Sequence, residues 1–203
     1  MTDNKIYVYV DTFSKNQIID SVYPPERDDE IKGCSNAKTR LEKFCVWKLL
    51  QFGLKNSLGY NVEDLQFYKS DNGKWFCDKC YFSLSHSKNA VAVAISSVPV
   101  GIDIQLITPP KRFIENKILN SEELSEFNLL KQSEITEYLI LKWCEKESLF
   151  KAEGENNFLT YAKLPSTFKT QTSKIILNDL PYALSVAAKN VDDIKYVIQK
   201  SDL

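Results

Sequence analysis

Hydrophobic and polar positions along this chain follow the periods of strands and helices. Apolar residues alternate with other residues in the strand-like segments and recur every three or four residues in the helix-like ones. The predicted strands are 6–11, 91–96, 101–107, 173–177, 182–188 and 196–198, and the predicted helices are 37–54, 122–130 and 134–151. Because strands and helices are mixed along the chain, we predict an α+β fold.

These elements fall into two halves of similar size, and the second half loosely repeats the rhythm of the first. Residues 96–99 form the best candidate for the connection, since serine and proline interrupt the pattern there. We therefore predict an N-terminal half over residues 1–97 and a C-terminal half over residues 98–203.

Composition and charge argue against a disordered chain and against a nucleic-acid-binding protein. Of the 203 residues, 43% are hydrophobic and 12% are aromatic, which suffices for ordinary cores and differs from a disordered chain. The formal net charge is -1, so no overall field favours nucleic acid, and any site for a polyanion must be local. We expect no binding to nucleic acid.

Targeting signals are not evident. The N-terminus lacks the charged and then apolar pattern of a signal peptide, and no apolar stretch approaches the roughly 18 residues needed to span a bilayer. We therefore expect a cytoplasmic protein without membrane contact. The odd number of cysteines fits reduced thiols better than a disulfide framework.

Cys77 and Cys80 form a Cys-x-x-Cys pair, which raises the possibility of zinc. No second pair follows, and the single histidine, His86, leaves the set one ligand short of a closed site unless another cysteine joins. A zinc-stabilised interaction domain is therefore a third hypothesis, ranked below the two developed next.

Two segments carry acids and a lysine at spacings that suit a metal ion and phosphates. Apolar residues fall on one parity of 100–106, so Asp103 and Gln105 share the other face of a half-buried strand. Glu147 and Lys151 are four residues apart and share one face of a helix. If Asp103 and Glu147 converge, they can hold Mg²⁺ together with phosphates and water, and Lys151 suits a pyrophosphate.

Each feature has a simpler interpretation when taken alone. A Glu/Lys pair four residues apart usually lies on a solvated helix surface, and an aspartate beside a glycine usually lies in a turn. The conjunction of the two segments favours the functional interpretation.

Four stretches resemble, in the right order, motifs of the 4'-phosphopantetheinyl transferases of the larger two-half type, which activate peptide, polyketide and fatty-acid synthase carrier domains. They are residues 72–75, 82–87, 99–105 and 143–154. The family patterns are Gly-Lys-Pro, Asn-x-Ser-His-Ser, Pro-x-Gly-x-Asp-x-Glu and Trp-x-x-Lys-Glu-x-x-x-Lys-x-x-Gly, of which the last two are the specific ones. The resemblance extends from about residue 37 to residue 189.

The chain departs from these patterns in places. Trp75 replaces the proline and Phe82-Ser83 replaces the typical Phe-Asn, which affects local loop geometry. Gln105 stands where many members carry an acid as a third metal ligand. Glutamine keeps an oxygen donor but removes one negative charge, so we interpret Gln105 as a modification of the site that weakens metal binding.

The resemblance implies that the halves are related by a pseudo-two-fold axis, with the active site at their interface. It implies transfer of phosphopantetheine from coenzyme A to a serine of an acyl or peptidyl carrier protein, with release of 3',5'-adenosine bisphosphate. The residues implied in coenzyme A binding are Lys38, Arg40, Lys74, Ser85 and His86. For Lys38 and Arg40 a solvated basic turn is an equal alternative, and a lone histidine is more often structural.

In this interpretation Asp103, Glu147 and Gln105 bind Mg²⁺, and the catalytic residues are Asp103, Glu147 and Lys151. Lys151 neutralises charge on the pyrophosphate, and Glu147, directly or through water, accepts the serine proton. We expect a monomer whose carrier partner docks near the interface of the halves and the segment 109–130. The apolar residues of that segment would otherwise pack under the domain.

The competing hypothesis is a degenerate relative that binds coenzyme A or a carrier protein but has lost the chemistry through Gln105. A serine hydrolase is disfavoured, since no Gly-x-Ser-x-Gly elbow is present and His86 adjoins the only tempting serine.

Overall fold

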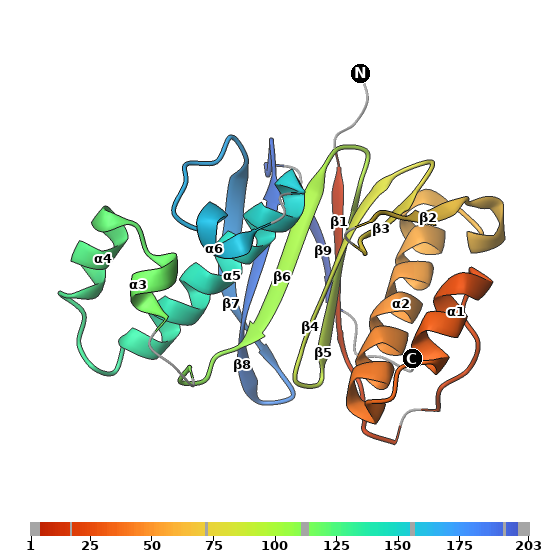
Figure 1. The fold of residues 1–203 in the computed structure, drawn as a ribbon, viewed down its shortest axis with the longest axis horizontal. Helices are drawn as coiled ribbons and strands as arrows, with labels where there is room; N and C mark the ends of the chain where they lie inside the picture. Colours follow the sequence, from red (N-terminus) through yellow and green to blue (C-terminus); the bar gives the residue numbers. More distant parts are fainter. Residues whose placement is uncertain are drawn as a thin grey trace.

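A computed structural model describes residues 5–198 apart from 17, 72, 111–113, 155, 156 and 193 (Figure 1). In chain order the elements are β1 (Ile6–Thr12), α1 (Pro25–Lys32), α2 (Ala37–Leu58), a short 3₁₀ helix η1 (Val62–Asp64), β2 (Phe67–Lys69), β3 (Trp75–Cys77), β4 (Tyr81–Ser87), β5 (Ala90–Ser96), β6 (Val100–Leu106), α3 (Glu115–Ile118), α4 (Ser121–Phe127), α5 (Ile135–Glu153), α6 (Phe158–Tyr161), β7 (Lys169–Leu177), β8 (Leu180–Ala188) and β9 (Ile194–Ile198). The predicted α+β class is confirmed. No helix of the described part is long and apolar enough to cross a membrane.

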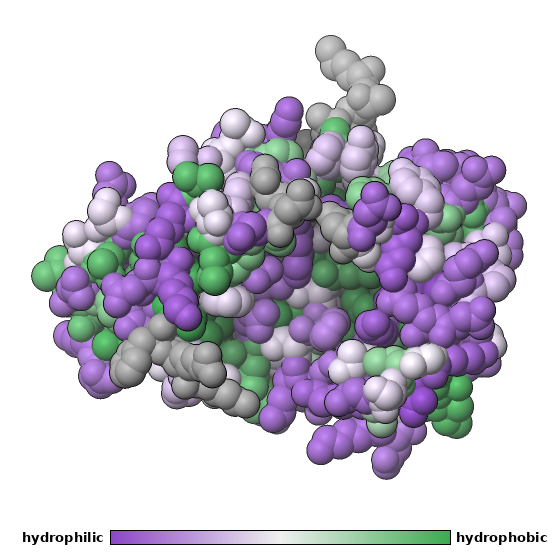
Figure 2. Space-filling model, viewed as in Figure 1, coloured by the Kyte–Doolittle hydropathy of each residue, from purple (hydrophilic) through white to green (hydrophobic). Residues whose placement is uncertain are grey.

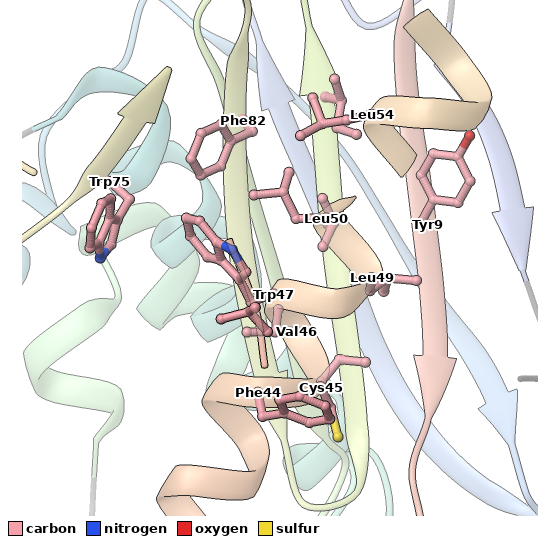
Figure 3. Packing of buried hydrophobic residues seen from close by; sticks show 14 of the residues in the cluster. Tyr9, Phe44, Cys45, Val46, Trp47, Leu49, Leu50, Leu54, Trp75 and Phe82 are labelled. Carbon is pink, nitrogen blue, oxygen red and sulfur yellow. The ribbon is translucent and has the colours of Figure 1, made fainter. Parts of the chain in front are cut away.

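The first sheet has the strand order β4-β5-β1-β9 and carries α2 on one face. Its β1 pairs with β5 in antiparallel and with β9 in parallel orientation, so a strand from the end of the chain completes the sheet begun by the first strand. The core beneath α2 is centred on Trp47, whose indole packs edge-on against Trp75 and Phe82 (Figure 3). Burying aromatic area of this size dominates the stabilisation of this half.

Local signals explain the bounds of α2. The side chain of Asn36 accepts a hydrogen bond from the backbone N–H of Thr39, which caps the first turn. Gly59 ends the helix in the left-handed conformation with φ 70°, which costs glycine little. The helix is one turn longer than the predicted 37–54. The sequence pattern did not indicate this last turn, because its residues are exposed or half-buried and its apolar pattern is weaker.

The second sheet has the strand order β6-β8-β7 and carries α5 on one face. A second apolar cluster, from β1 and β5 on one side and β6 and β8 on the other, fills the space between the two sheets. The two sheets therefore pack between α2 and α5, an arrangement that Figure 1 shows.

Three serines of β4 join the sheets. The hydroxyls of Ser83, Ser85 and Ser87 accept hydrogen bonds from the backbone N–H groups of Ile102, Ile104 and Leu106, at 3.0–3.1 Å. Every second residue of β4 thus contacts β6, which sets the position of β6 against the first sheet.

The predicted half-burial of the strand 100–106 is wrong. Gly101 and Asp103, on the face expected to be polar and open, are buried because α5 covers that face. Gly101 permits this approach, since an added Cβ would lie 1.9 Å from the carbonyl oxygen of Ser148 and 2.6 Å from the nitrogen of Ala152.

We therefore expect Gly101→Ala to lower the free energy of unfolding by about 3 kcal/mol or more, because backbone on both sides must move. A thermal or denaturant melt measures this. Gly33→Ala is the matched control, since Gly33 has φ -71° and an added Cβ would lie 3.1 Å from its nearest neighbour. Equal stability of the two variants would contradict the packing described for β6 and α5.

Candidate active site

Asp103 lies at the middle of β6 with only 2% of its surface exposed. Its Oδ1 accepts hydrogen bonds from the Ser85 hydroxyl and from Lys151 Nζ, both at 2.7 Å, and its Oδ2 accepts from Gln105 Nε2 at 3.2 Å. Such a carboxylate is held in one orientation, which suits a role in binding or catalysis.

Lys151 extends from α5 to Asp103. Besides the 2.7 Å ion pair with Asp103, its ammonium donates to the carbonyl oxygen of Ile102 at 3.1 Å. The alternative interpretation of Glu147 and Lys151 as a solvated surface pair is therefore wrong, since Lys151 spans to another element. The two motif segments converge as predicted.

Glu147 lies one helical turn before Lys151 and is half-buried. Burial raises the pKa of its carboxyl group, the charge of Lys151 opposes this, and the charge of Asp103 adds to it. Two carboxylates within electrostatic reach of each other destabilise one another unless a cation lies near both. A raised pKa also makes Glu147 a stronger proton acceptor.

Gln105 joins this group through its neighbours on β6 and β4. Its amide nitrogen donates to Asp103, and its Oε1 accepts from the Ser87 hydroxyl at 3.3 Å. The prediction that Asp103 and Gln105 share one face of the strand is confirmed. Among the described residues, no group of three His, Cys, Asp or Glu side chains is placed to hold a metal ion.

An open cleft of about 540 Å³ adjoins this cluster. The face in Figure 2 is hollowed between the two halves, with hydrophilic residues along the side of α1 and α2. Four cations and one carboxylate are among the described lining residues, namely Arg27, Lys43, Lys74, Lys151 and Glu30. The cleft is thus locally positive in a chain of net charge -1, which favours an anionic ligand.

Lys74 and His86, both predicted to bind coenzyme A, line the cleft. Lys74 follows Gly73, which has φ 85°, and its Nζ donates to the carbonyl oxygen of Lys151 at 2.8 Å. Burial, and then the charge of Lys151, lowers the pKa of Lys74. The residue before β3 thereby places a second lysine beside α5.

Three other predicted binding residues lie outside the cleft lining. Ser85 is buried and bonded to Asp103 and to the backbone of Ile104, so it positions the carboxylate. Lys38 is 67% exposed in its side chain and pairs with Glu42 at 3.4 Å. Arg40 is half-buried on the first turns of α2.

Sequence reasoning missed Arg27, Glu30 and Lys43, which line the cleft from α1 and α2. Glu30 accepts hydrogen bonds from Lys43, Lys69 and the indole N–H of Trp75 at 3.0–3.1 Å, and it pairs with Arg27. The pKa of Glu30 is lowered to about 2, where burial is outweighed by these cations and hydrogen bonds. Trp75, the departure from the family's proline, thus organises this end of the cleft.

The cysteine pair does not gather metal ligands in the described structure. All five cysteines are free, and the sulfurs of Cys77 and Cys80 lie 3.4 Å apart. A hydrogen bond from Cys80 lowers the pKa of Cys77 to about 7. Cys77 is the last residue of β3 and belongs to the same core cluster as Trp75, and Cys80 packs against that cluster.

Comparison with known families agrees with this geometry. The family model described as the 4'-phosphopantetheinyl transferase superfamily matches residues 99–195, which include Asp103, Glu147 and Lys151. The matched stretch, somewhat less than half of the chain, is similar to this superfamily. Both β6 and α5 lie within the matched residues.

Several proteins named 4'-phosphopantetheinyl transferase are similar in sequence to parts of this chain. The chain is 25% identical to 4'-phosphopantetheinyl transferase Sfp of Bacillus subtilis (strain 168) over 74% of the chain and 70% of Sfp. It is 33% identical to the transferase gsp of Aneurinibacillus migulanus, over 48% of the chain and 41% of gsp. It is 30% identical to ffp of Bacillus subtilis, over 47% of the chain and 44% of ffp. The chain thus spans less than half of the latter two relatives.

Proposed function

We propose that this protein is a 4'-phosphopantetheinyl transferase that moves phosphopantetheine from coenzyme A to a serine of an acyl or peptidyl carrier protein. The observation that carries the proposal is the convergence of Asp103, Glu147 and Lys151 beside a positively charged cleft, within residues 99–195 that match this superfamily. The relatives named above bear this activity in their names.

The charges of the cleft suit coenzyme A, which carries several phosphates. Lys151 contacts Asp103, and Lys74 contacts the backbone carbonyl of Lys151, so both lysines suit the pyrophosphate, which is the reacting part of the donor. Arg27 and Lys43 lie toward α1 and supply further positive charge, which Glu30 offsets only in part. Half-buried cations bind phosphate more strongly than surface ones, because water screens them less.

The donor set near Asp103 fits Mg²⁺. Asp103 and Glu147 supply hard carboxylate oxygens within electrostatic reach of each other. Gln105 lies beside Asp103 with its amide nitrogen toward the carboxylate and its oxygen toward Ser87, so its oxygen would become a ligand only after the amide turned over. Bound there with the pyrophosphate, Mg²⁺ would neutralise phosphate charge. Two carboxylates suffice when phosphate oxygens and water complete the coordination shell.

In the transfer step the carrier serine oxygen attacks the β-phosphorus of coenzyme A. The new bond joins this oxygen to the β-phosphorus. The bond between the β-phosphorus and the bridging oxygen breaks, and that oxygen leaves on the α-phosphate as part of 3',5'-adenosine bisphosphate. Glu147 accepts the serine proton, directly or through water, which its raised pKa favours. Lys151 stabilises charge on the pyrophosphate, and Asp103 fixes the ammonium of Lys151 for this task.

The proposal extends to the relation between the two halves and to the docking of the carrier. Each half places one long helix on its sheet, which supports a pseudo-two-fold relation between the halves with the site at their interface. We propose that the carrier docks near this interface and the protein acts in the cytoplasm as a monomer. Of the segment 109–130, Phe113 lies outside the described residues, and Ile118 and Leu119 are buried. Docking there must therefore use other residues of the segment.

Product analysis tests the proposed reaction. Incubation with coenzyme A, Mg²⁺ and an apo carrier protein should release 3',5'-adenosine bisphosphate, detected by liquid chromatography. Release should require the carrier and should stop when its acceptor serine is replaced by alanine. If coenzyme A binds but no bisphosphate appears with any apo carrier type, the degenerate binding relative is the better account.

The variant Gln105→Glu distinguishes an active enzyme that tolerates glutamine at this position from a relative that has lost the transfer reaction. The wild-type protein should transfer phosphopantetheine, and the restored acid should lower the Mg²⁺ concentration for half-maximal rate by about threefold to tenfold, because one more negative charge faces the cation. Titration of the transfer rate with Mg²⁺ measures both forms. An inactive wild type beside an active Gln105→Glu variant would identify Gln105 as a disabling substitution.

A further inference from the structure

Glu42 is a buried carboxylate on the inner side of α2. Only 7% of its surface is exposed, and its neighbours along the helix, Leu41 and Phe44, belong to the core. A carboxylate in such a position costs free energy unless charged or polar groups compensate it. Its role therefore depends on the groups that face it.

Two basic side chains, those of Lys38 and His86, face Glu42 in the described structure. Lys38 Nζ lies 3.4 Å from Oε1, but the Lys38 side chain is 67% exposed, so water screens this pair. His86 Nδ1 lies 3.6 Å from Oε2, and His86 belongs to a different element, β4. The contact with His86 thus links α2 to the strand that also carries Ser85.

The alternation of β4 directs His86 to this side. Ser85 and Ser87 face β6, so His86 between them points the other way, toward α2 and the cleft. With Nδ1 toward Glu42, the opposite ring nitrogen, Nε2, is left for a ligand in the cleft. The ring is 40% exposed, which leaves room for that ligand.

The charges around His86 come from three elements. The pKa of the imidazole is lowered, first by partial burial and then by the charges of Lys151 and Lys38, while Glu42 and Asp103 oppose this shift. Among these groups Glu42 is the strongest influence that favours the protonated ring. Without Glu42, the two lysines and the partial burial would leave His86 neutral over a wider pH range.

We propose that Glu42 is a positioning residue for His86, which holds Nδ1 of the ring and thereby directs Nε2 toward a phosphate of the donor in the cleft. This inference rests on the proposed function, because it takes coenzyme A as the ligand. Nothing in the sequence pattern indicated it, since Glu42 lies within an apolar helix face.

A double-mutant cycle tests the proposal. Glu42→Gln keeps the shape of the side chain and should weaken coenzyme A binding by about threefold to tenfold, measured by calorimetry. In a His86→Ala background the same substitution should change the affinity less than about twofold, because the effect passes through the ring. Glu145→Gln, which removes a carboxylate paired with Lys142 on α5, is the control and should leave the affinity unchanged.

A second readout reports on the ring itself. His86 is the only histidine in the chain, so one imidazole signal appears in a long-range proton–nitrogen NMR spectrum. In Glu42→Gln the titration midpoint of that signal should move to lower pH, because loss of the carboxylate destabilises the protonated ring. The control Glu145→Gln should leave the midpoint in place. Circular dichroism confirms that each variant is folded.

The outcomes separate this inference from the proposed function. An unchanged midpoint in Glu42→Gln, or an equal loss of affinity with and without His86, overturns the positioning role. Wild-type protein that binds coenzyme A without transferring phosphopantetheine overturns the transferase proposal. The positioning role of Glu42 is then decided by the double-mutant cycle alone. Wild-type protein that does not bind coenzyme A overturns both.

Discussion

Asp103→Asn should reduce phosphopantetheine transfer by about 10³-fold or more while the chain stays folded. The amide keeps the size of the carboxylate but removes the charge that holds Lys151 and one of the two carboxylates proposed to bind Mg²⁺. The structure makes asparagine a better test than alanine. Asp103 is buried and bonded to Ser85, Gln105 and Lys151, so alanine would also leave a cavity and unpaired partners.

The measurement is the steady-state transfer rate, with a thermal melt to verify folding. Asp192→Asn is the control, since Asp192 is exposed and lies far along the chain beside Asn190. A folded Asp103→Asn protein with a rate near that of the wild type would remove Asp103 from the site.

Lys151→Ala should lower kcat by about 10²-fold or more, with a smaller loss of coenzyme A affinity. The ammonium is held between Asp103 Oδ1 and the carbonyl oxygen of Ile102, so it is fixed before the reaction starts. Such a group stabilises the charge that develops in transfer more than it stabilises the bound ground state. Lys151→Arg should recover only part of the rate, because a planar guanidinium does not fit the place of a compact ammonium.

Separate measurement of kcat and of the coenzyme A dissociation constant checks this role. Lys174→Ala is the matched control, since Lys174 forms an ion pair with Glu137 in which both side chains are more than 40% exposed. Its loss should leave both quantities unchanged, because exposed pairs contribute little. If Lys151→Ala behaved like Lys174→Ala, Lys151 would have no part in catalysis.

The long elements were predictable because their signals are strong and local. The helices α2 and α5 carry apolar residues at helical spacing over many turns, and β6 shows a period of two. The spacing of Glu147 and Lys151 predicted a shared helix face, and the family motifs predicted that this face meets Asp103. The contact between Lys151 and Asp103 agrees with that prediction.

Other features depend on contacts that no local pattern reveals. The eight residues of α1 are mostly charged, and only Ile31 is a buried apolar residue, so no amphipathic period marks the helix. Arg27 is buried there because it lies over Trp47, a residue twenty positions away in the chain. The burial of β6 on both faces depends on the close approach of α5 to Gly101, which is likewise a tertiary effect.

The residues that line the cleft also depend on tertiary contacts that the sequence pattern does not reveal. Lys38 and Arg40 were chosen from their place at the start of a helix, whereas the basic residue of α2 that lines the cleft among the described residues is Lys43, one turn further along. Helix spacing places Lys43 and Lys38 on different faces, but sequence alone does not say which face meets the cleft. The face that meets the cleft depends on tertiary structure, namely on β3, which carries Trp75, and on Glu30, which accepts a hydrogen bond from the Trp75 indole.

The mass of an apo carrier protein, measured before and after incubation, tests the central claim most directly. With coenzyme A, Mg²⁺ and the wild-type enzyme, we expect a gain of one phosphopantetheine group on the carrier. With Asp103→Asn, or with the metal removed by a chelator, the carrier should keep its apo mass over the same period. An equal gain with the wild type, with Asp103→Asn and with chelated metal would contradict the account, because transfer would then not depend on the Asp103 site.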